Sequence, residues 1–437
     1  MEEMETIESF RARVRAFVAA NLRPLSADDS YGPLRSIGSE DKERLGFERD
    51  REIQRQLFES DLAGICFPRE YGGLGQPPAY QKVFNEEITG FEYPARLQAP
   101  TLNPCAAVLL DFGTEEQKQA HIPAILKGEE IWMQLLSEPS GGSDVAAALT
   151  SAVREGDDWI LNGSKVWTTG AWWSDWGLCL ARTNWDVPKH RGLTVFIFPI
   201  RAEGVTVSRI EMLNGSNEFC QEFLTDVRVP DSDRVGEVDG GWTVGTRWMF
   251  HERMLLNSSF VTVQGSGGHS DVGADALVTI AKEVGRTEDP EAHSIVGEVR
   301  MLELVKFALN ARVGAAMQSG AMNDQCAALS RLFGGVTTAR SYTLAFDRAG
   351  PAAIAWSDDD GEVRHTGLDF LMRQASSIGG GTLEMARNVV SERVLGMPRE
   401  RTHDKALPFR EVPRGPSSRL TPPPDPPLPR PCTFPRL

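Results

Sequence analysis

The stretch WILNGSKVWTT, residues 159–169, decides which fold class the chain belongs to. Two runs rich in aromatic and β-branched residues, 159–161 and 165–169, flank the pair Asn162-Gly163. Such runs favour strands, and an Asn-Gly pair between them is typical of a two-residue hairpin turn. The stretch therefore predicts a β-hairpin near the middle of the chain.

Further short β-rich segments follow this stretch, and apolar residues recur at helical spacing on both sides of the β-rich region. Strands of this length and spacing suggest a compact antiparallel barrel or sandwich, and the later helical segments are numerous enough for a bundle. We therefore expect a mixed α and β, multidomain fold. Its parts are an α-helical N-terminal domain over 1–130, a central antiparallel β-barrel over 131–242 and a C-terminal helical bundle over 243–400.

The last segment, 401–437, differs from the rest in composition. Seven prolines between 422 and 431 lie among arginines, with few large apolar residues. Such a segment cannot bury a core of its own, so we expect an extended or disordered tail.

Charge and composition narrow the function classes. The 437 residues are 41% apolar and carry a formal net charge of −15, which argues against a nucleic-acid partner. No apolar run approaches the roughly 20 residues that span a bilayer, and the acidic N-terminus fits neither a secretory signal nor a transit peptide. Six scattered cysteines lack zinc or CxxC spacing, so we expect reduced thiols, no metal and a cytoplasmic protein.

A glycine-rich stretch, SSIGGGTLEMAR at 376–387, precedes the last predicted helix. Thr382 is a good N-cap, because its hydroxyl can accept a hydrogen bond from an amide in the first turn. Glycines allow a ligand to approach the backbone, and the amides at a helix start favour an anion. The stretch predicts a phosphate or carboxylate cradle, with a flexible loop as the alternative.

Two polar segments could hold other parts of a ligand. The loop QLLSEPSGGSD at 134–144 offers hydroxyls and glycine amides, although an ordinary surface loop has the same composition. In Trp167-Thr168-Thr169, an indole beside two hydroxyls can flank a flat ring, and a core tryptophan is the alternative.

Glu252 is the most informative titratable residue. It falls on the same helical face as the apolar residues Val244, Trp248 and Leu255. Burial there should raise the pKa of the carboxyl, which is the setting of an effective base near neutral pH. The alternative is a buried ion pair, for example with Arg253.

Taken together, these pieces resemble the acyl-CoA dehydrogenase family of flavoproteins from about residue 5 to residue 400. Seven segments carry the resemblance in the same order along the chain. They are 67–75 (FPREYGGLG), 113–132 (GTEEQKQAHIPAILKGEEIW), 136–144 (LSEPSGGSD), 161–171 (LNGSKVWTTGA), 226–230 (DVRVP), 250–253 (FHER) and 380–400 (GGTLEMARNVVSERVLGMPRE).

The resemblance implies an α-helical domain, a β-barrel and a C-terminal four-helix bundle, with FAD bound between subunits of a homodimer or homotetramer. It also assigns residues to the site. Flavin contacts would come from Gln134, Leu136, Ser137, Ser143, Trp167, Thr168, Thr169, Thr382, Leu383 and Glu384, and substrate contacts from Ser143, Arg253 and Gly381.

The reaction that the resemblance implies is α,β-dehydrogenation of an acyl-CoA thioester. A glutamate removes the α-proton while a hydride passes from the β-carbon to the flavin, and an electron-transfer flavoprotein takes the electrons. Many members carry this glutamate at the position of Gly380, which has no acid or base function. Glu252-Arg253 instead resembles the arrangement of the isovaleryl-CoA dehydrogenase subset.

Two features typical of the family are missing, and both belong to its FAD contacts across subunits. Near 281–285 only Lys282 is basic where the family has an arginine, and 347–351 (DRAGP) replaces a glycine-rich segment. Two alternatives therefore stay open: an FAD-binding subunit of a heteromeric dehydrogenase, and a flavin-dependent oxidase or monooxygenase on the same fold. The identity of the acyl chain does not follow from the sequence.

Overall fold

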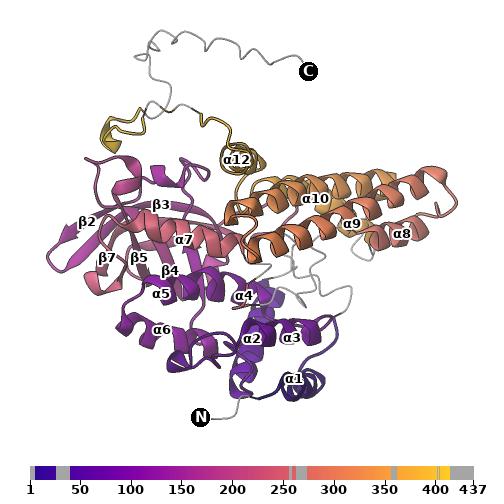
Figure 1. Cartoon of the computed structure of the whole chain (residues 1–437), viewed down its shortest axis with the longest axis horizontal. Helices are drawn as coiled ribbons and strands as arrows, with labels where there is room; N and C mark the ends of the chain where they lie inside the picture. Colours follow the sequence, from indigo (N-terminus) through magenta and orange to yellow (C-terminus); the bar gives the residue numbers. More distant parts are fainter. Residues whose placement is uncertain are drawn as a thin grey trace, which may run out of the picture.

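The computed structural model describes residues 5–25, 40–254, 258–261, 273–355, 362–400, 402 and 404–413. N-terminal helices, a central sheet and C-terminal helices follow one another along the chain (Figure 1). The predicted mixed α and β fold, with its parts in this order, is confirmed.

The N-terminal part consists of helices around an apolar core that includes Phe10, Ile53 and Phe84. A π-helical turn at Thr101–Ala106 connects two short helices and packs against the sheet. The helices are α1 (Ile7–Asn21), α2 (Glu40–Glu59), α3 (Pro78–Ile88), α4 (Ala95–Pro100), α5 (Ala107–Phe112) and α6 (Glu115–Lys127).

The strands of the described residues form one eight-stranded sheet in the order β6-β7-β3-β2-β4-β5-β8, with β1 also paired to β4. The predicted antiparallel barrel is not confirmed, because this order ends at β6 and β8 and β1 pairs with β4 in parallel. The strands are β1 (Trp132–Leu135), β2 (Ser151–Glu155), β3 (Asp158–Thr169), β4 (Trp176–Arg182), β5 (Leu193–Pro199), β6 (Val205–Arg209), β7 (Phe219–Pro230) and β8 (Arg234–Val235).

The predicted hairpin turn at Asn162-Gly163 is wrong, since β3 runs through it and pairs with β7 on both sides of a bulge. A Cβ on Gly163 would lie 2.5 Å from Thr150 Oγ1, so the bulge needs a glycine. Asn162 exchanges two hydrogen bonds with Asp226 of β7, at 2.9 and 3.0 Å. Asn162-Gly163, a pair that favours hairpin turns, forms a bulge within one strand in this protein.

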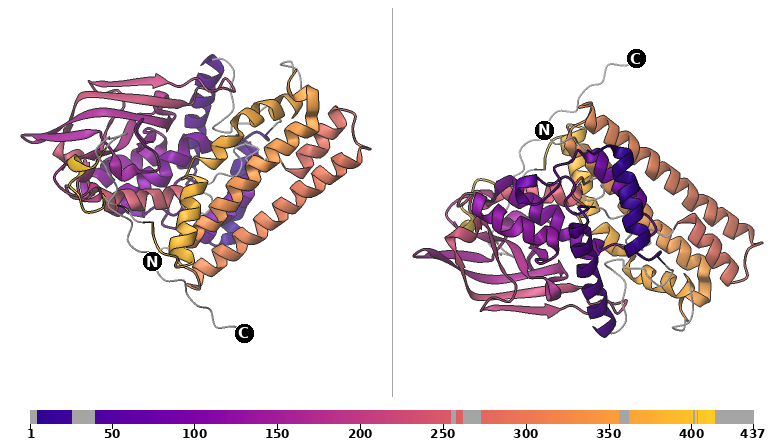
Figure 2. Two further views of the ribbon diagram at one scale, coloured as in Figure 1. Left: turned by 90° about the horizontal axis from the view of Figure 1, so that it is seen from above. Right: turned by 90° about the horizontal axis from the view of Figure 1, so that it is seen from below.

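The C-terminal helices separate into two sets. Helix α7 (Gly241–Arg253) packs against α5 and β5, whereas α10 (Ala327–Ala349) contacts α8 (Ala274–Glu283), α9 (Pro290–Gln318) and α11 (Glu362–Met372). Figures 1 and 2 show α9 and α10 as a long arm, with α12 (Leu383–Val389) between this arm and the sheet.

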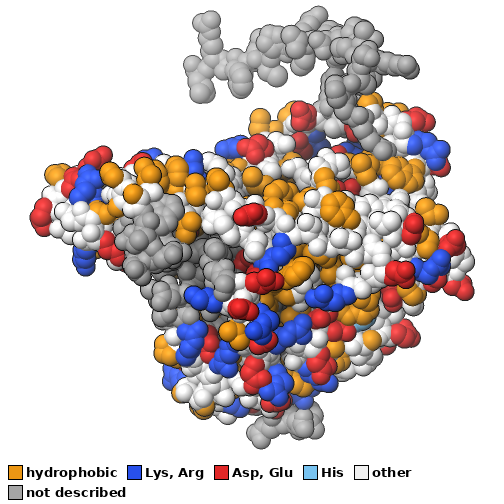
Figure 3. Space-filling model, turned by 180° about the vertical axis from the view of Figure 1, so that it is seen from behind, with side chains coloured by type: hydrophobic (Ala, Val, Ile, Leu, Met, Phe, Trp, Pro, Cys, Tyr) orange, Lys and Arg blue, Asp and Glu red, His pale blue; other side chains and the backbone are white. Residues whose placement is uncertain are grey.

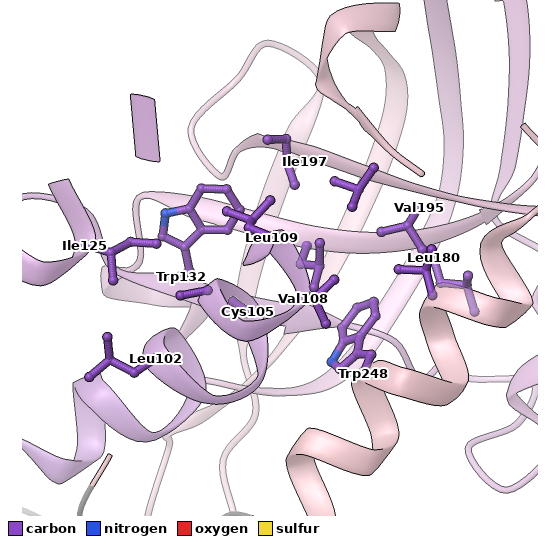
Figure 4. Close-up of a cluster of buried hydrophobic side chains, with 14 of the residues drawn as sticks. Leu102, Cys105, Val108, Leu109, Ile125, Trp132, Leu180, Val195, Ile197 and Trp248 are labelled. Atoms are coloured by element: carbon purple, nitrogen blue, oxygen red, sulfur yellow. The ribbon is translucent and has the colours of Figure 1, made fainter. Parts of the chain in front are cut away.

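The largest apolar cluster joins α7 to the rest of the molecule (Figure 4). The indole of Trp248 on α7 and that of Trp132 on β1 are fully buried in it. Side chains of α5, α6, β4 and β5 fill the space around them. Helix α7 is therefore fixed to the sheet and the N-terminal helices rather than to the arm.

The prediction for the tail is wrong for its first part. Phe409 is buried, with its ring 3.7 Å from the guanidinium carbon of Arg182 and stacked on Trp185. The amide of Phe409 donates to the carbonyl of Val187 at 2.9 Å. One large aromatic residue can dock on an existing domain even where a segment cannot build a core of its own. Residues 414–437, which include the proline-rich run, lie outside the described residues.

Within the described ranges, no helix is long and apolar enough to cross a membrane. Cys66, Cys105, Cys179, Cys220 and Cys326 are free thiols, as predicted for the cysteines that the structure describes. In the same ranges, no group of three or more His, Cys, Asp or Glu side chains could hold a metal ion.

Candidate functional site

A fully buried ion pair anchors the loop that follows β1. Lys165 of β3 donates from Nζ to Glu138 Oε1 at 2.9 Å and to the carbonyl of Leu180 at 2.6 Å. Glu138 also accepts the amides of Leu149 and Thr150 at 2.6 and 2.9 Å. Burial raises the pKa of Glu138, but Lys165 and the donors outweigh it, so the net pKa lies below its ordinary value. Neither charged residue is among the site residues predicted from the sequence.

The loop after β1 runs beside both β3 and α7. The amide of Val166 donates to the carbonyl of Ser137 at 3.0 Å, and the indole Nε1 of Trp248 donates to Gln134 Oε1 at 2.6 Å. Leu136 and Ser137 are half-buried, whereas Ser143 is exposed at the far end of the loop. These two bonds hold the start of the loop against β3, next to Trp167, and against α7.

The side chains of Trp167 and Thr168 differ sharply in exposure. Trp167 has a positive φ of 66° beside a second bulge of β3, and its indole is 54% exposed. This excludes the alternative of a core tryptophan. The buried Thr168 instead donates to Glu222 Oε2 at 2.9 Å, and burial raises the pKa of Glu222 to about 8. Thr169 is half-buried.

Glu252 lies in the last turn of α7 and is half-buried. Burial raises the pKa of its carboxyl, and the neighbouring Arg253, which is exposed, partly offsets this. Val244 and Trp248 of the predicted apolar face are buried, whereas Leu255 lies outside the described residues. The ion pairs among the described residues do not include Glu252.

A polar cluster that the sequence analysis missed lies next to Glu252. His251 Nε2 and Arg247 Nε lie 2.9 and 2.6 Å from the same oxygen, Oδ2, of Asp111 on α5. Burial lowers the pKa of His251, and Asp111 opposes this shift. This pairing ties the end of α7 to α5.

The stretch before α12 begins a helix as predicted, with Thr382 Oγ1 accepting from the amide of Met385 at 3.2 Å. Arg331 of α10 donates to the carbonyls of Ser376, Gly379 and Gly381 at 2.8 to 3.0 Å. Both Gly380 and Gly381 have positive φ, and a Cβ on Gly381 would meet nothing within 4 Å. The hydrogen bonds described for this loop lie within it and its flanking helices or run to α10, so they do not join it to Trp167 or to the loop at 134–144.

The residues around the first loop suit a flat ring with a polar edge, such as a flavin. Trp167 offers an exposed ring face, and the loop offers the Ser137 hydroxyl and the amide of Gly142, whereas the amide of Gly141 donates to the carbonyl of Glu138 at 2.9 Å. A Cβ on Gly141 would meet nothing within 4 Å, and one on Gly142 would meet only the side chain of Ser137 at 3.4 Å or more. The backbone there is open to a ligand.

Comparisons with known proteins place the chain among oxidoreductases that combine helical domains with a central sheet. The acyl-CoA dehydrogenase N-terminal domain matches residues 4–129, and the acyl-CoA dehydrogenase middle domain matches residues 134–249. The chain belongs to the acyl-CoA dehydrogenase family, whose members dehydrogenate acyl-CoA thioesters with a flavin. The predicted family and enzyme class are confirmed.

Three similar proteins span nearly the whole chain. Acyl-CoA dehydrogenase IpdE1 of Mycobacterium tuberculosis is 30% identical over 401 residues, which are 91% of this chain and 99% of the relative. The structure of the Tcur3481-Tcur3483 steroid ACAD has 27% identity and a TM-score of 0.72, covering 92% of this chain and all of that chain. The ChsE4-ChsE5 complex from Mycobacterium tuberculosis has 27% identity, a TM-score of 0.67 and the same coverage.

Proposed function

We propose that this chain catalyses the FAD-dependent α,β-dehydrogenation of an acyl-CoA thioester, with Glu252 as the base. The observation that carries the proposal is a half-buried, raised-pKa carboxylate on a helix that Trp248 links to the loop at Gln134. Gly380, at the other position where the family places its base, has no side chain that could take a proton.

The residues proposed to hold FAD come from three segments. The first is the loop with Gln134, Leu136, Ser137 and Ser143, and the second is the end of β3 with Trp167, Thr168 and Thr169. The third is the start of α12 with Thr382, Leu383 and Glu384. The Thr168 hydroxyl donates to Glu222. We therefore propose that Thr168 supports the neighbouring Trp167 from behind. FAD, when bound, accepts the hydride from the β-carbon.

On the substrate side, Glu252 takes the α-proton of the thioester. A carboxylate with a raised pKa is a stronger base than one in water, and it still releases the proton near neutral pH. The exposed Arg253 suits the phosphates of CoA, together with Ser143, while Gly381 leaves room for the thioester. Holding the substrate between base and flavin is the larger part of the catalytic task.

The Glu252→Gln variant tests the assignment of the base. After anaerobic mixing with a good acyl-CoA substrate, we expect its flavin to stay oxidised, because an amide cannot accept the α-proton. Glu86→Gln is the matched control, since it makes the same change on α3, in a surface ion pair with Arg11. Flavin bleaching of Glu252→Gln at the wild-type rate would contradict the proposal.

The substrate is proposed from the comparisons rather than from the site. Similarity to a structure described as a steroid ACAD favours a bulky, ring-bearing acyl group over a short straight chain. A panel of straight, branched and steroid-derived acyl-CoA thioesters, ranked by the rate of flavin bleaching, tests this. Preference for the straight chains would refute it.

A second candidate is an FAD-binding subunit of a heteromeric dehydrogenase that passes electrons to an electron-transfer flavoprotein. The observation in its favour is an uncovered apolar face on α9, which includes Met301, Leu304, Val305 and Phe307. Two of the similar structures carry names that join two different chains. If the chain expressed alone forms a flavin-loaded, active homodimer or homotetramer, an obligate partner is ruled out.

A further inference from the structure

Asn103, in the π-helical turn Thr101–Ala106, is the side chain that joins this turn to the end of α7. It is 2% exposed, and its Nδ2 donates to the carbonyl oxygen of His251 at 2.5 Å. Its Oδ1 accepts a hydrogen bond from Ser258 Oγ at 3.0 Å. One buried amide therefore contacts residues on both sides of the pair Glu252-Arg253.

The contact has a clear physical reason at the helix end. The last carbonyls of a helix lack the usual partner four residues later, and a buried carbonyl without a donor is costly. The carbonyl of His251 receives the amide of Met254 at 3.1 Å and the side chain of Asn103. Asn103 thus completes the hydrogen bonding of the residue directly before Glu252.

The turn that carries Asn103 is itself held in place. Thr101 Oγ1 accepts from the amide of Trp132 at 3.0 Å and lies 3.2 Å from the carbonyl of the same residue. Leu102 and Cys105 are buried in the large apolar cluster. The side-chain amide of Asn103 is therefore held by a turn that is itself fixed in position.

We propose that Asn103 is a positioning residue, which holds the end of α7 so that the Glu252 carboxylate keeps one orientation toward the substrate. This inference rests on the proposed function of Glu252 as the base. Asn103 contacts the backbone of the helix and takes no part in the proton transfer itself.

Other charged groups near α7 could also affect Glu252. They are Asp111 on α5, Arg247, His251 and Arg253 on α7 itself, and Lys189, His190 and Arg191 in the turn before β5; the π-helical turn and β5 carry none. None of them is removed by a change at Asn103. Loss of the Asn103 hydrogen bond would admit water to the helix end, and hydration lowers a pKa that burial has raised.

Asn103→Ala and Asn103→Leu, tested in the flavin-loaded enzyme, separate positioning from stability. We expect anaerobic flavin reduction to slow by about tenfold to a hundredfold, with little change in KM, because a small misplacement of a reacting group has this cost. The acidic limb of the pH–rate profile should move to lower pH. Asn103→Leu keeps about the same side-chain volume and lacks both the donor and the acceptor, so the same direction is expected.

Gln54→Ala is the matched control, since Gln54 is equally buried and donates from Nε2 to the carbonyl of Leu126 at 2.7 Å, away from α7. It should lower the melting temperature to a similar extent and leave the rate and the pH profile unchanged. If the Asn103 variants behave like Gln54→Ala, the inference is wrong. If Glu252→Gln still bleaches its flavin at the wild-type rate, the proposed function itself fails.

Should the Asn103 variants fail to fold, Ser258→Ala provides the same test from the other side of Glu252. Loss of the Ser258 hydroxyl frees Oδ1 of Asn103, and a slower reduction with the acidic limb at lower pH supports the inference. An unchanged pH profile and rate overturn it.

Discussion

The β-sheet region and the α9–α10 arm differ in which side chains they bury. In the sheet region, even charged groups are enclosed: Lys165 meets Glu138, and the fully buried Arg182 donates to the carbonyls of Ala146 and Ala148 at 2.6 and 3.0 Å. On α9, apolar side chains lie open, with Leu304 62% and Phe307 76% exposed. Figure 3 shows hydrophobic side chains along this arm.

This difference indicates which part of the molecule buries its side chains without the help of a second subunit. A helix that is apolar on most of its faces is normally buried. In the sheet region, Lys165, Glu138 and Arg182 find their partners within one chain, whereas apolar side chains on the outer face of α9 stay uncovered. We infer that the arm serves assembly and that the sheet region serves the chemistry.

The largest expected effect comes from breaking the enclosed ion pair of the sheet region. Lys165→Met leaves Glu138 buried without its cation, and removing one partner of such a pair costs about 3–5 kcal/mol of unfolding free energy. Because Glu138 anchors the loop at 136–150, flavin retention should fall as well. Denaturant unfolding and the flavin content of the purified protein measure both.

Arg228→Met is the control for this change. Arg228 pairs with Glu155 and Asp158 on the exposed face of the same sheet. Since exposed ion pairs add little, we expect unfolding and flavin content like the wild type. Equal losses of unfolding free energy and flavin content in both variants would show that the enclosed ion pair contributes no more than the exposed one.

A second prediction concerns the arm. Phe307→Ser should weaken subunit association by about 1.5–3 kcal/mol, the amount for burying one large apolar side chain, and leave the fold of each subunit intact. Sedimentation over a range of concentrations measures the association. Val153→Ser, an equally polar change at a side chain 62% exposed on β2, should have no such effect. An unchanged assembly in Phe307→Ser would refute the inference that α9 is an interface.

The smallest effect is expected at Glu222 on β7, a carboxyl of the sheet region that is incompletely paired. Glu222 Oε1 is buried without a hydrogen-bond partner in the described structure, and burial raises the pKa of this group to about 8. The folded state therefore binds a proton more tightly than the unfolded state, so stability falls as pH rises from about 4.5 through about 8.

Glu222→Gln should remove this slope. We expect a gain of about 1–3 kcal/mol over the wild type at pH 9 and little difference at pH 4, because a neutral amide replaces a buried charge. Thermal unfolding across this pH range measures it. A parallel pH dependence in both proteins would show that another group, such as Glu218 with its similarly raised pKa, governs the slope.

Local signals along the chain were good predictors of where elements begin, and weak predictors of what lies between them. The Thr382 hydroxyl was predicted as a cap from its own neighbourhood, and it caps α12. Asn162-Gly163 has the same local preference in a hairpin turn and in a bulge, so only the partner strand decides between them.

The parts of the candidate site that could not be predicted depend on residues far apart in the chain. Glu138 and Lys165 are 27 positions apart, and Asn103 and His251 are 148 apart. The pattern of one helix singled out Glu252 but could not identify the amide that supports its backbone. Contacts of this kind follow from the tertiary fold alone.

The packing of Phe409 against Arg182 and Trp185 has a practical consequence for protein engineering. A truncated chain that ends at residue 400 would remove this ring and expose the surface beneath it, inviting aggregation. A shortened version intended for crystallisation should therefore keep residues 404–413. A purification tag fused directly after residue 400 would replace these residues and leave the surface under Phe409 uncovered.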